Sequence, residues 1–88
     1  MLRLVYRAEV FQEDDQWVGL CPDLDVSSFG DNPDEAKQSL KETVEAFIEG
    51  CAELGSLPDV LVESGFVKEG DVWRIRERFT DELKAVVA

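Results

Sequence analysis

One helical pattern in the middle of the chain limits the possible folds more than any other feature. The run Asn32-Pro33-Asp34-Glu35 is a helix start, because Asn32 can cap, Pro33 fits the first helical position and Glu35 stands where a capping-box partner belongs. Apolar residues then recur at steps of three and four: Ala36, Leu40, Val44, Phe47, Ile48, Cys51 and Leu54. The spacing predicts a helix of about 22 residues with one apolar stripe, ended by Gly55. Such a stripe has to be covered by a sheet or by another helix.

The residues before this helix have a period of two, which is typical of strands. The alternation from Leu2 to Phe11 predicts a strand of about 9–11 residues. Residues 13–16 form a turn, and 17–21 a second strand, so that the two make a hairpin. Residues 22–25, with a proline and two aspartates, predict a further turn, followed by a short third strand over 26–30.

After the helix, a short second helix is predicted to run to Ser64, and Phe66-Val67 then leads into a turn over 68–71. Alternation over 72–79 predicts a fourth strand, whereas 83–87 suit either a terminal strand or a frayed helix. We therefore expect one α+β domain over 1–88, in the order β-β-β-α-β. In it, a three-stranded antiparallel meander and a fourth strand carry one long helix. If the last strand runs parallel to the first, the right-handed crossover rule places it beside the first strand.

The net charge and the residue content limit which ligands and which kinds of functional site this chain can have. The net charge is −11, from 20 acidic and 9 basic residues, which argues against nucleic acid or an anionic membrane as a direct ligand and favours a basic partner. The chain has no histidine, and its cysteines, Cys21 and Cys51, fall at apolar positions. We therefore expect buried free thiols, no metal site, no cofactor and no catalytic residues. With no apolar run longer than four residues and no signal-peptide pattern, the expected location is cytoplasmic.

Two groups of carboxylates are candidates for partner binding. Four glutamates of the predicted helix share one side, which we call the acidic ridge: Glu42, Glu45, Glu49 and Glu53. Like charges four residues apart destabilise a helix by about 0.2–0.5 kcal/mol per pair, so the ridge is either a solvated face or a docking surface for a basic partner. Asp14 and Asp15 are a second candidate, although aspartate is also ordinary in turns. Asp14, Asp15 and Asp23 would be the carboxylates of a metal-dependent nuclease, a weaker alternative.

A single helix covers only one face of a sheet, so the other face is expected to be partly apolar. Candidates for that face, and for the interface of a homodimer or higher homo-oligomer, are Val5, Phe11 and Trp17. Arg74, Arg76 and Arg78 alternate along the last predicted strand and therefore share a face. They either protect that strand or meet an acidic patch on another copy.

The order of short motifs over the first 54 residues resembles the HicB-like antitoxin family. The pieces are Tyr6-Arg7-Ala8-Glu9-Val10-Phe11, Glu13-Asp14-Asp15-Gln16-Trp17-Val18, Cys21-Pro22-Asp23-Leu24, Ser28-Phe29-Gly30-Asp31 and Asp34-Glu35-Ala36. The resemblance implies a partial, degenerate RNase H-like fold without nuclease activity. It also implies a partner: a HicA-like toxin, a small basic RNA-cleaving protein that the antitoxin binds and neutralises. Residues 55–88 are too few for the DNA-binding domain that many such antitoxins add, so a short form is expected.

Besides the nuclease, the sequence therefore leaves two hypotheses about function, which belong to different classes. The first is an antitoxin-like protein-binding module that neutralises a basic toxin. The second is a solitary regulatory or structural homo-oligomer with no toxin partner.

Overall fold

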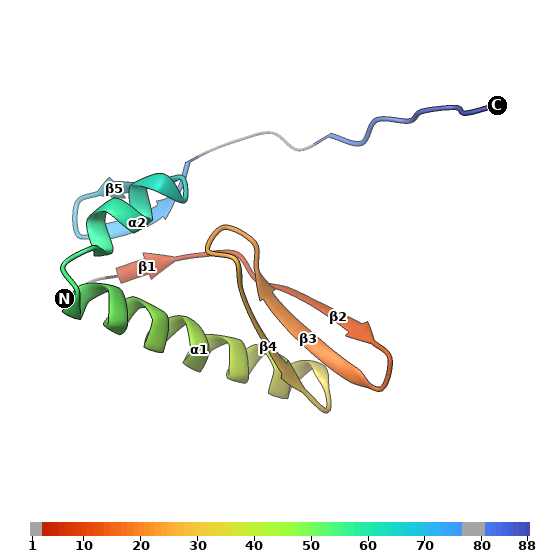
Figure 1. Ribbon diagram of the computed structural model, residues 1–88, viewed down its shortest axis with the longest axis horizontal. Coiled ribbons are helices and arrows are strands. Elements are labelled where there is room, and N and C mark those ends of the chain that lie inside the picture. Colours follow the sequence, from red (N-terminus) through yellow and green to blue (C-terminus); the bar gives the residue numbers. More distant parts are fainter. Residues whose placement is uncertain (1–2, 77–80) are drawn as a thin grey trace.

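The computed structural model describes residues 3–76 and 81–88, and its fold is α+β (Figure 1). The elements in chain order are β1 Arg3–Val5, β2 Glu9–Glu13, β3 Gln16–Cys21, β4 Val26–Gly30, α1 Pro33–Glu53, α2 Leu57–Glu63, β5 Phe66–Glu69 and β6 Val72–Ile75. Strands β2, β3 and β4 form an antiparallel meander, and a second sheet has the strand order β1-β6-β5. The predicted α+β class is therefore confirmed.

The first predicted strand is divided into β1 and β2. β1 pairs in parallel with β6, with Leu4 opposite Trp73, whereas β2 pairs antiparallel with β3, with Phe11 opposite Val18. Residues 6–8 lie between the two strands, where the chain changes its pairing partner. In this segment the Arg7 side chain donates to the Asp23 carboxylate, with 2.9 Å between Nη2 and Oδ1. The apolar alternation continues through the division, so the sequence pattern could not reveal it.

The segment after α2 forms a hairpin that was only partly predicted. Residues 68 and 69, expected in a turn, belong to β5, which pairs antiparallel with β6. Only 70 and 71 make the turn, with Gly70 at a φ of 65°. β6 ends at Ile75, earlier than predicted, and residues 77–79 of the predicted strand lie outside the described part. β6 runs parallel to β1 and lies beside it, as expected. Residues 83–87 are in neither a helix nor a strand.

The ends of α1 agree closely with the prediction. The Asn32 Oδ1 accepts a hydrogen bond from the Glu35 backbone N–H at 2.9 Å, and the Asn32 amide donates to the Glu35 carboxylate at 2.6 Å. The helix covers 21 residues, and Gly55 follows it at a φ of 73°. The assignment of Leu54 to the apolar stripe was wrong. As the C-cap it lies beyond the last helical turn, and its side chain is 84% exposed.

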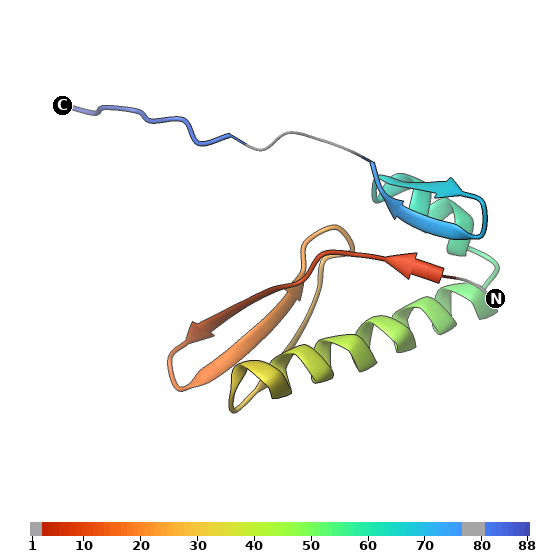
Figure 2. The same ribbon diagram turned by 180° about the vertical axis from the view of Figure 1, so that it is seen from behind.

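Two glycines allow α1 to lie directly on the meander. A Cβ on Gly19 would stand 2.6 Å from the Ala36 carbonyl oxygen, and one on Gly30 would stand 2.5 Å from the Ala36 backbone nitrogen. The Ser28 and Ser39 hydroxyls join β4 to α1 with a hydrogen bond of 2.6 Å. Gly19 and Ser28 are paired neighbours, so these contacts define the face of the meander that α1 covers. The helix packs mainly on β4 and β3 and much less on β2 (Figures 1 and 2).

The core lies between the meander, α1 and the C-terminal hairpin. Its fully buried residues include Cys21, Leu40, Val44, Leu61 and Phe66. Both cysteines are free and buried, as expected, and burial is the main cause that raises the pKa of the Cys21 thiol. Among the described residues, neither helix combines the length and apolar character that crossing a bilayer requires.

Replacing Gly50 with alanine is expected to stabilise the protein. A Cβ at this position in α1 would meet no atom within 4 Å, so the change adds helix propensity without a clash. The free energy of unfolding should rise by about 0.5–1 kcal/mol, measured by urea unfolding followed by circular dichroism. An unchanged or lower midpoint would show that the backbone at Gly50 is needed for close packing.

Candidate functional site

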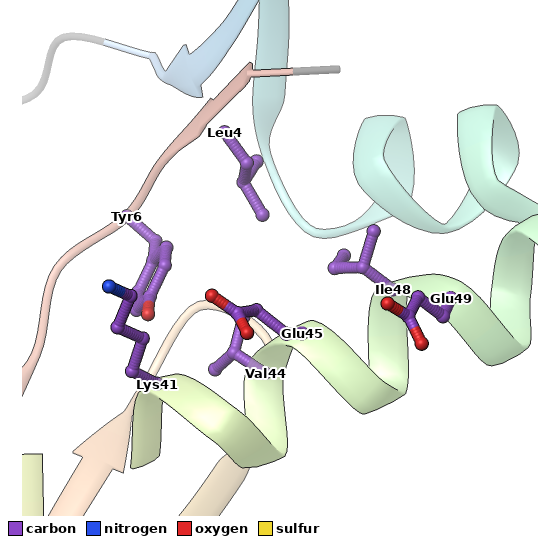
Figure 3. Close-up of a pocket in the computed structure, with 7 residues that line it drawn as sticks. All are labelled: Leu4, Tyr6, Lys41, Val44, Glu45, Ile48 and Glu49. Carbon is purple, nitrogen blue, oxygen red and sulfur yellow. The ribbon is translucent and has the colours of Figure 1, made fainter. Parts of the chain in front are cut away.

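A groove with a volume of about 350 Å³ runs between α1 and the N-terminal strand (Figure 3). Val44 and Ile48 of α1 form its apolar helix side, and Leu4 of β1 with Tyr6 forms the opposite wall. α1 packs mainly on β4 and β3, whereas its side facing β1 borders this groove. The remaining lining residues are charged: Lys41, Glu45 and Glu49.

Helix geometry separates the apolar and charged parts of this groove. Residues four apart lie above one another on a helix, so Lys41, Glu45 and Glu49 form one exposed line. Val44 and Ile48 form the neighbouring line toward the core, and Val44 is almost fully buried. The groove therefore has an apolar interior and a charged outer edge.

The charges are not distributed evenly along this edge. Figure 3 shows Lys41 beside Tyr6 at one end, Glu45 in the middle and Glu49 beyond Ile48 at the other end. The pKa of Tyr6 is raised, first by burial and then by negative charge on Cys21 and Glu45. The raised pKa keeps the phenol protonated at neutral pH. Because Glu49 lies at the end of the groove away from Lys41, that end is the anionic one.

The four glutamates of the acidic ridge are all exposed. The ion pairs that the described residues form are Arg7–Asp23, Lys37–Asp34 and Arg74–Glu69, and none of these includes a ridge residue. Glu42 accepts a hydrogen bond of 3.3 Å from Gln38. The last turn of α1 has no basic residue, although a helix C-terminus favours positive charge. Glu45 and Glu49 belong both to this ridge and to the groove.

Asp14 and Asp15 do not lie near the acidic ridge. They lie in the turn between β2 and β3, at the end of the molecule opposite the C-terminal half of α1 (Figure 1). Asp14 has a φ of 55°, a left-handed conformation that aspartate tolerates in tight hairpins. The turn geometry therefore explains why an aspartate is tolerated at position 14.

The carboxylates considered for a nuclease do not form a cluster either. The Asp23 side chain is only 4% exposed and is held by Arg7, away from the β2–β3 turn. Within residues 3–76 and 81–88, no group of three or more acidic or cysteine side chains is arranged to hold a metal ion.

The meander has an open face on the side away from α1. On this face, Phe11 of β2 pairs with Val18 of β3, which pairs in turn with Phe29 of β4. Val18 and Phe29 directly adjoin Gly19 and Ser28 in the strands, so their side chains point to the opposite face of the sheet. Val18 is buried between two phenylalanines that are 40% and 54% exposed. Val5 is 50% exposed, but it belongs to β1 in the other sheet.

Trp17 does not belong to this open face. It shares its side of β3 with Gly19 and Cys21, which face α1, and it is partly buried. The expectation for Trp17 was wrong because a shift of one residue along a strand moves a side chain to the other face. Phe29 was missed, since only the register with Val18 shows that it lies on the same face as Phe11, across β3.

The arginines of the last strand have separate surroundings. Arg74 lies opposite Val5 and forms an ion pair with Glu69 across the β5–β6 hairpin, at 3.3 Å. Arg76 is exposed, and its backbone N–H donates to the Gly65 carbonyl at 3.1 Å. Arg78 lies outside the described residues.

The candidate site thus consists of the groove, the acidic ridge and the open face. A scan against protein-family models and searches of curated proteins and of solved structures returned no match to this chain.

Proposed function

We propose that this chain is an antitoxin-like protein-binding module that acts in the cytoplasm and neutralises a small basic HicA-like toxin by direct binding. The observation that carries the proposal is the acidic ridge, whose four exposed glutamates take part in none of the ion pairs formed by the described residues. Repulsion along the ridge and its position near the helix C-terminus both weaken α1. A basic partner would relieve both effects and would be attracted from a distance.

The resemblance to HicB-like antitoxins supports the same function. Its motifs fall on β2, the β2–β3 hairpin, the turn after Cys21 and the capped start of α1. The three antiparallel strands followed by one long helix are compatible with the degenerate RNase H-like fold that we propose for the chain.

We infer that the chain acts by binding rather than by catalysis. Asp14 and Asp15 are exposed in a hairpin turn, and Asp23 is engaged by Arg7, so the three carboxylates considered for a nuclease do not converge. No cofactor is part of the proposed mechanism.

The proposal is tested by co-expression in a bacterial host. The chain is produced together with a candidate toxin, the product of a small basic reading frame adjacent to its own gene. The candidate toxin expressed alone is the toxic control. We expect this chain to restore growth and a variant with the four ridge glutamates changed to lysine to fail. Continued growth arrest with the folded wild-type chain present would contradict the proposed function.

The open face supports a second candidate, a homo-oligomer without a toxin. Glu9 and Glu13 flank Phe11 on β2, Arg74 lies opposite Val5 on the neighbouring strand, and Arg76 is exposed just beyond that strand. A two-fold axis through the open face could place the arginines of one copy toward the glutamates of the other. Such a dimer would leave the groove and the acidic ridge free, so it is also compatible with toxin binding.

Light scattering at micromolar concentration tests this association. We expect twice the single-chain mass of 9.9 kDa for the wild type and a shift toward the single-chain mass for Phe11→Ser with Phe29→Ser. Val62→Ser removes an exposed apolar side chain from α2 and should leave the mass unchanged. A wild-type mass of one chain would exclude the dimer.

A further inference from the structure

We propose that the groove between α1 and β1 receives one arginine side chain of the basic partner together with an apolar residue next to that arginine. This inference rests on the proposed function, because it assumes that the partner is basic. It goes further in naming the groove, rather than the acidic ridge as a whole, as the place where the partner is anchored.

The interior of the groove fits the carbon stem of a long basic side chain. Leu4, Val44 and Ile48 present aliphatic groups from opposite sides, and Tyr6 adds an aromatic ring. Long cationic side chains bury their methylene stems on apolar surface while the charged head remains near water. The ring also offers a face to a cation or to an apolar neighbour.

The outer edge fits the charged head. Glu45 and Glu49 are four residues apart on the helix, about 6 Å along its axis, and both line the groove. A planar guanidinium has five N–H donors in a fixed fork and can face two carboxylates, whereas an ammonium is a compact point charge. The geometry therefore favours arginine over lysine.

Lys41 determines what occupies the other end. It stands beside Tyr6 (Figure 3), so it would repel a second cation there. The partner residue at that end is therefore apolar. The occupant is a basic–apolar pair oriented with its cation toward Glu49.

Charge complementarity selects this occupant over the alternatives. A second copy of this chain also has a net charge of −11 and would bring like charge to Glu45 and Glu49. The open face, not the groove, provides the apolar area for such a copy. Nucleic acid would be repelled by the same carboxylates.

The test is an NMR titration of the isotope-labelled chain with the capped dipeptide acetyl-Leu-Arg-amide at low salt. Acetyl-Leu-citrulline-amide, which has nearly the same shape without the charge, is the control peptide. We expect the arginine peptide to shift the signals of Tyr6, Val44 and Ile48 most strongly. The citrulline peptide should shift them several-fold less at the same concentration.

Matched charge variants distinguish peptide binding in the groove from general attraction by the negative charge of the chain. Glu45→Gln with Glu49→Gln should weaken peptide binding by about threefold to tenfold, whereas Glu42→Gln with Glu53→Gln, outside the groove lining, should weaken it by less than about twofold. Each pair removes the same charge, and thermal unfolding checks that both variants are folded. Equal weakening by the two pairs, or equal shifts with both peptides, would overturn the inference.

The peptide experiment does not need the toxin, so two failures can be told apart. If the toxin is neutralised but the peptide does not bind in the groove, the anchor assignment is wrong and the proposed function stands. If the peptide binds in the groove but no toxin is neutralised, the proposed function is wrong.

Discussion

Gly19→Ala is expected to lower the free energy of unfolding by about 2–3 kcal/mol, a large part of the roughly 5 kcal/mol available to a domain of this size. The new methyl group would stand 2.6 Å from the Ala36 carbonyl oxygen and 3.1 Å from the Leu40 Cβ. The carbonyl belongs to the backbone of α1, so relief requires the helix to move away from β3. Such a movement would also lengthen the Ser28–Ser39 hydrogen bond and open the core above Cys21.

Urea unfolding followed by circular dichroism measures this effect, with Gly50→Ala as the matched control. Both variants make the same chemical change, but a Cβ at Gly50 meets no atom within 4 Å. The two substitutions should therefore shift the midpoint in opposite directions. A Gly19→Ala midpoint equal to that of the wild type would contradict the direct packing of α1 on β3.

Changing Glu45 and Glu49 to glutamine is expected to slow association with a basic partner by about threefold to tenfold at low salt. The reason is electrostatic steering, which shows mainly in the association rate and is screened within about 8 Å at physiological ionic strength. The slowing should therefore shrink at high salt. Folding stability should be equal or higher, by up to about 0.5 kcal/mol, because repulsion between like charges on α1 is removed.

Stopped-flow or surface-based kinetics against the purified partner measure this effect. Glu42→Gln with Glu53→Gln removes the same charge from the same helix and should slow association similarly. Only the change at Glu45 and Glu49 should also speed dissociation, because these two line the groove. If the Glu45 and Glu49 double variant associates at the wild-type rate at low salt, the ridge is only a solvated face.

Local signals in the sequence predicted the ends of α1 correctly. The cap at Asn32, the partner at Glu35 and the left-handed Gly55 act within a few residues of chain, so their effect can be anticipated without a tertiary structure. The same holds for the hairpin between β2 and β3. The acidic ridge also follows from helix spacing alone.

Features that depend on pairing partners could not be predicted in this way. The division of the first strand at 6–8 arises because β1 pairs with β6 while β2 pairs with β3. β5 was missed because half of it, Lys68 and Glu69, has no apolar signal. Trp17 was assigned to the wrong face because the face depends on register and not on composition.

The groove could not have been predicted either. Val44 and Ile48 were recognised as members of the apolar stripe, and Glu45 and Glu49 as members of the ridge. Nothing local indicated that Leu4 and Tyr6 would lie opposite them, because that depends on the pairing of β1 with β6 and on the packing of α1.

The most direct test of the proposed function is the salt dependence of binding between this chain and a purified candidate toxin, the product of any small basic reading frame found beside its gene. Calorimetry at several salt concentrations measures it, with an unrelated small basic protein as the control. We expect a defined stoichiometry, an affinity that falls steeply as salt rises and at least about tenfold weaker binding of the control. The absence of binding at low salt, or equal binding of both basic proteins, would contradict the proposal that this chain is a dedicated partner of a basic toxin.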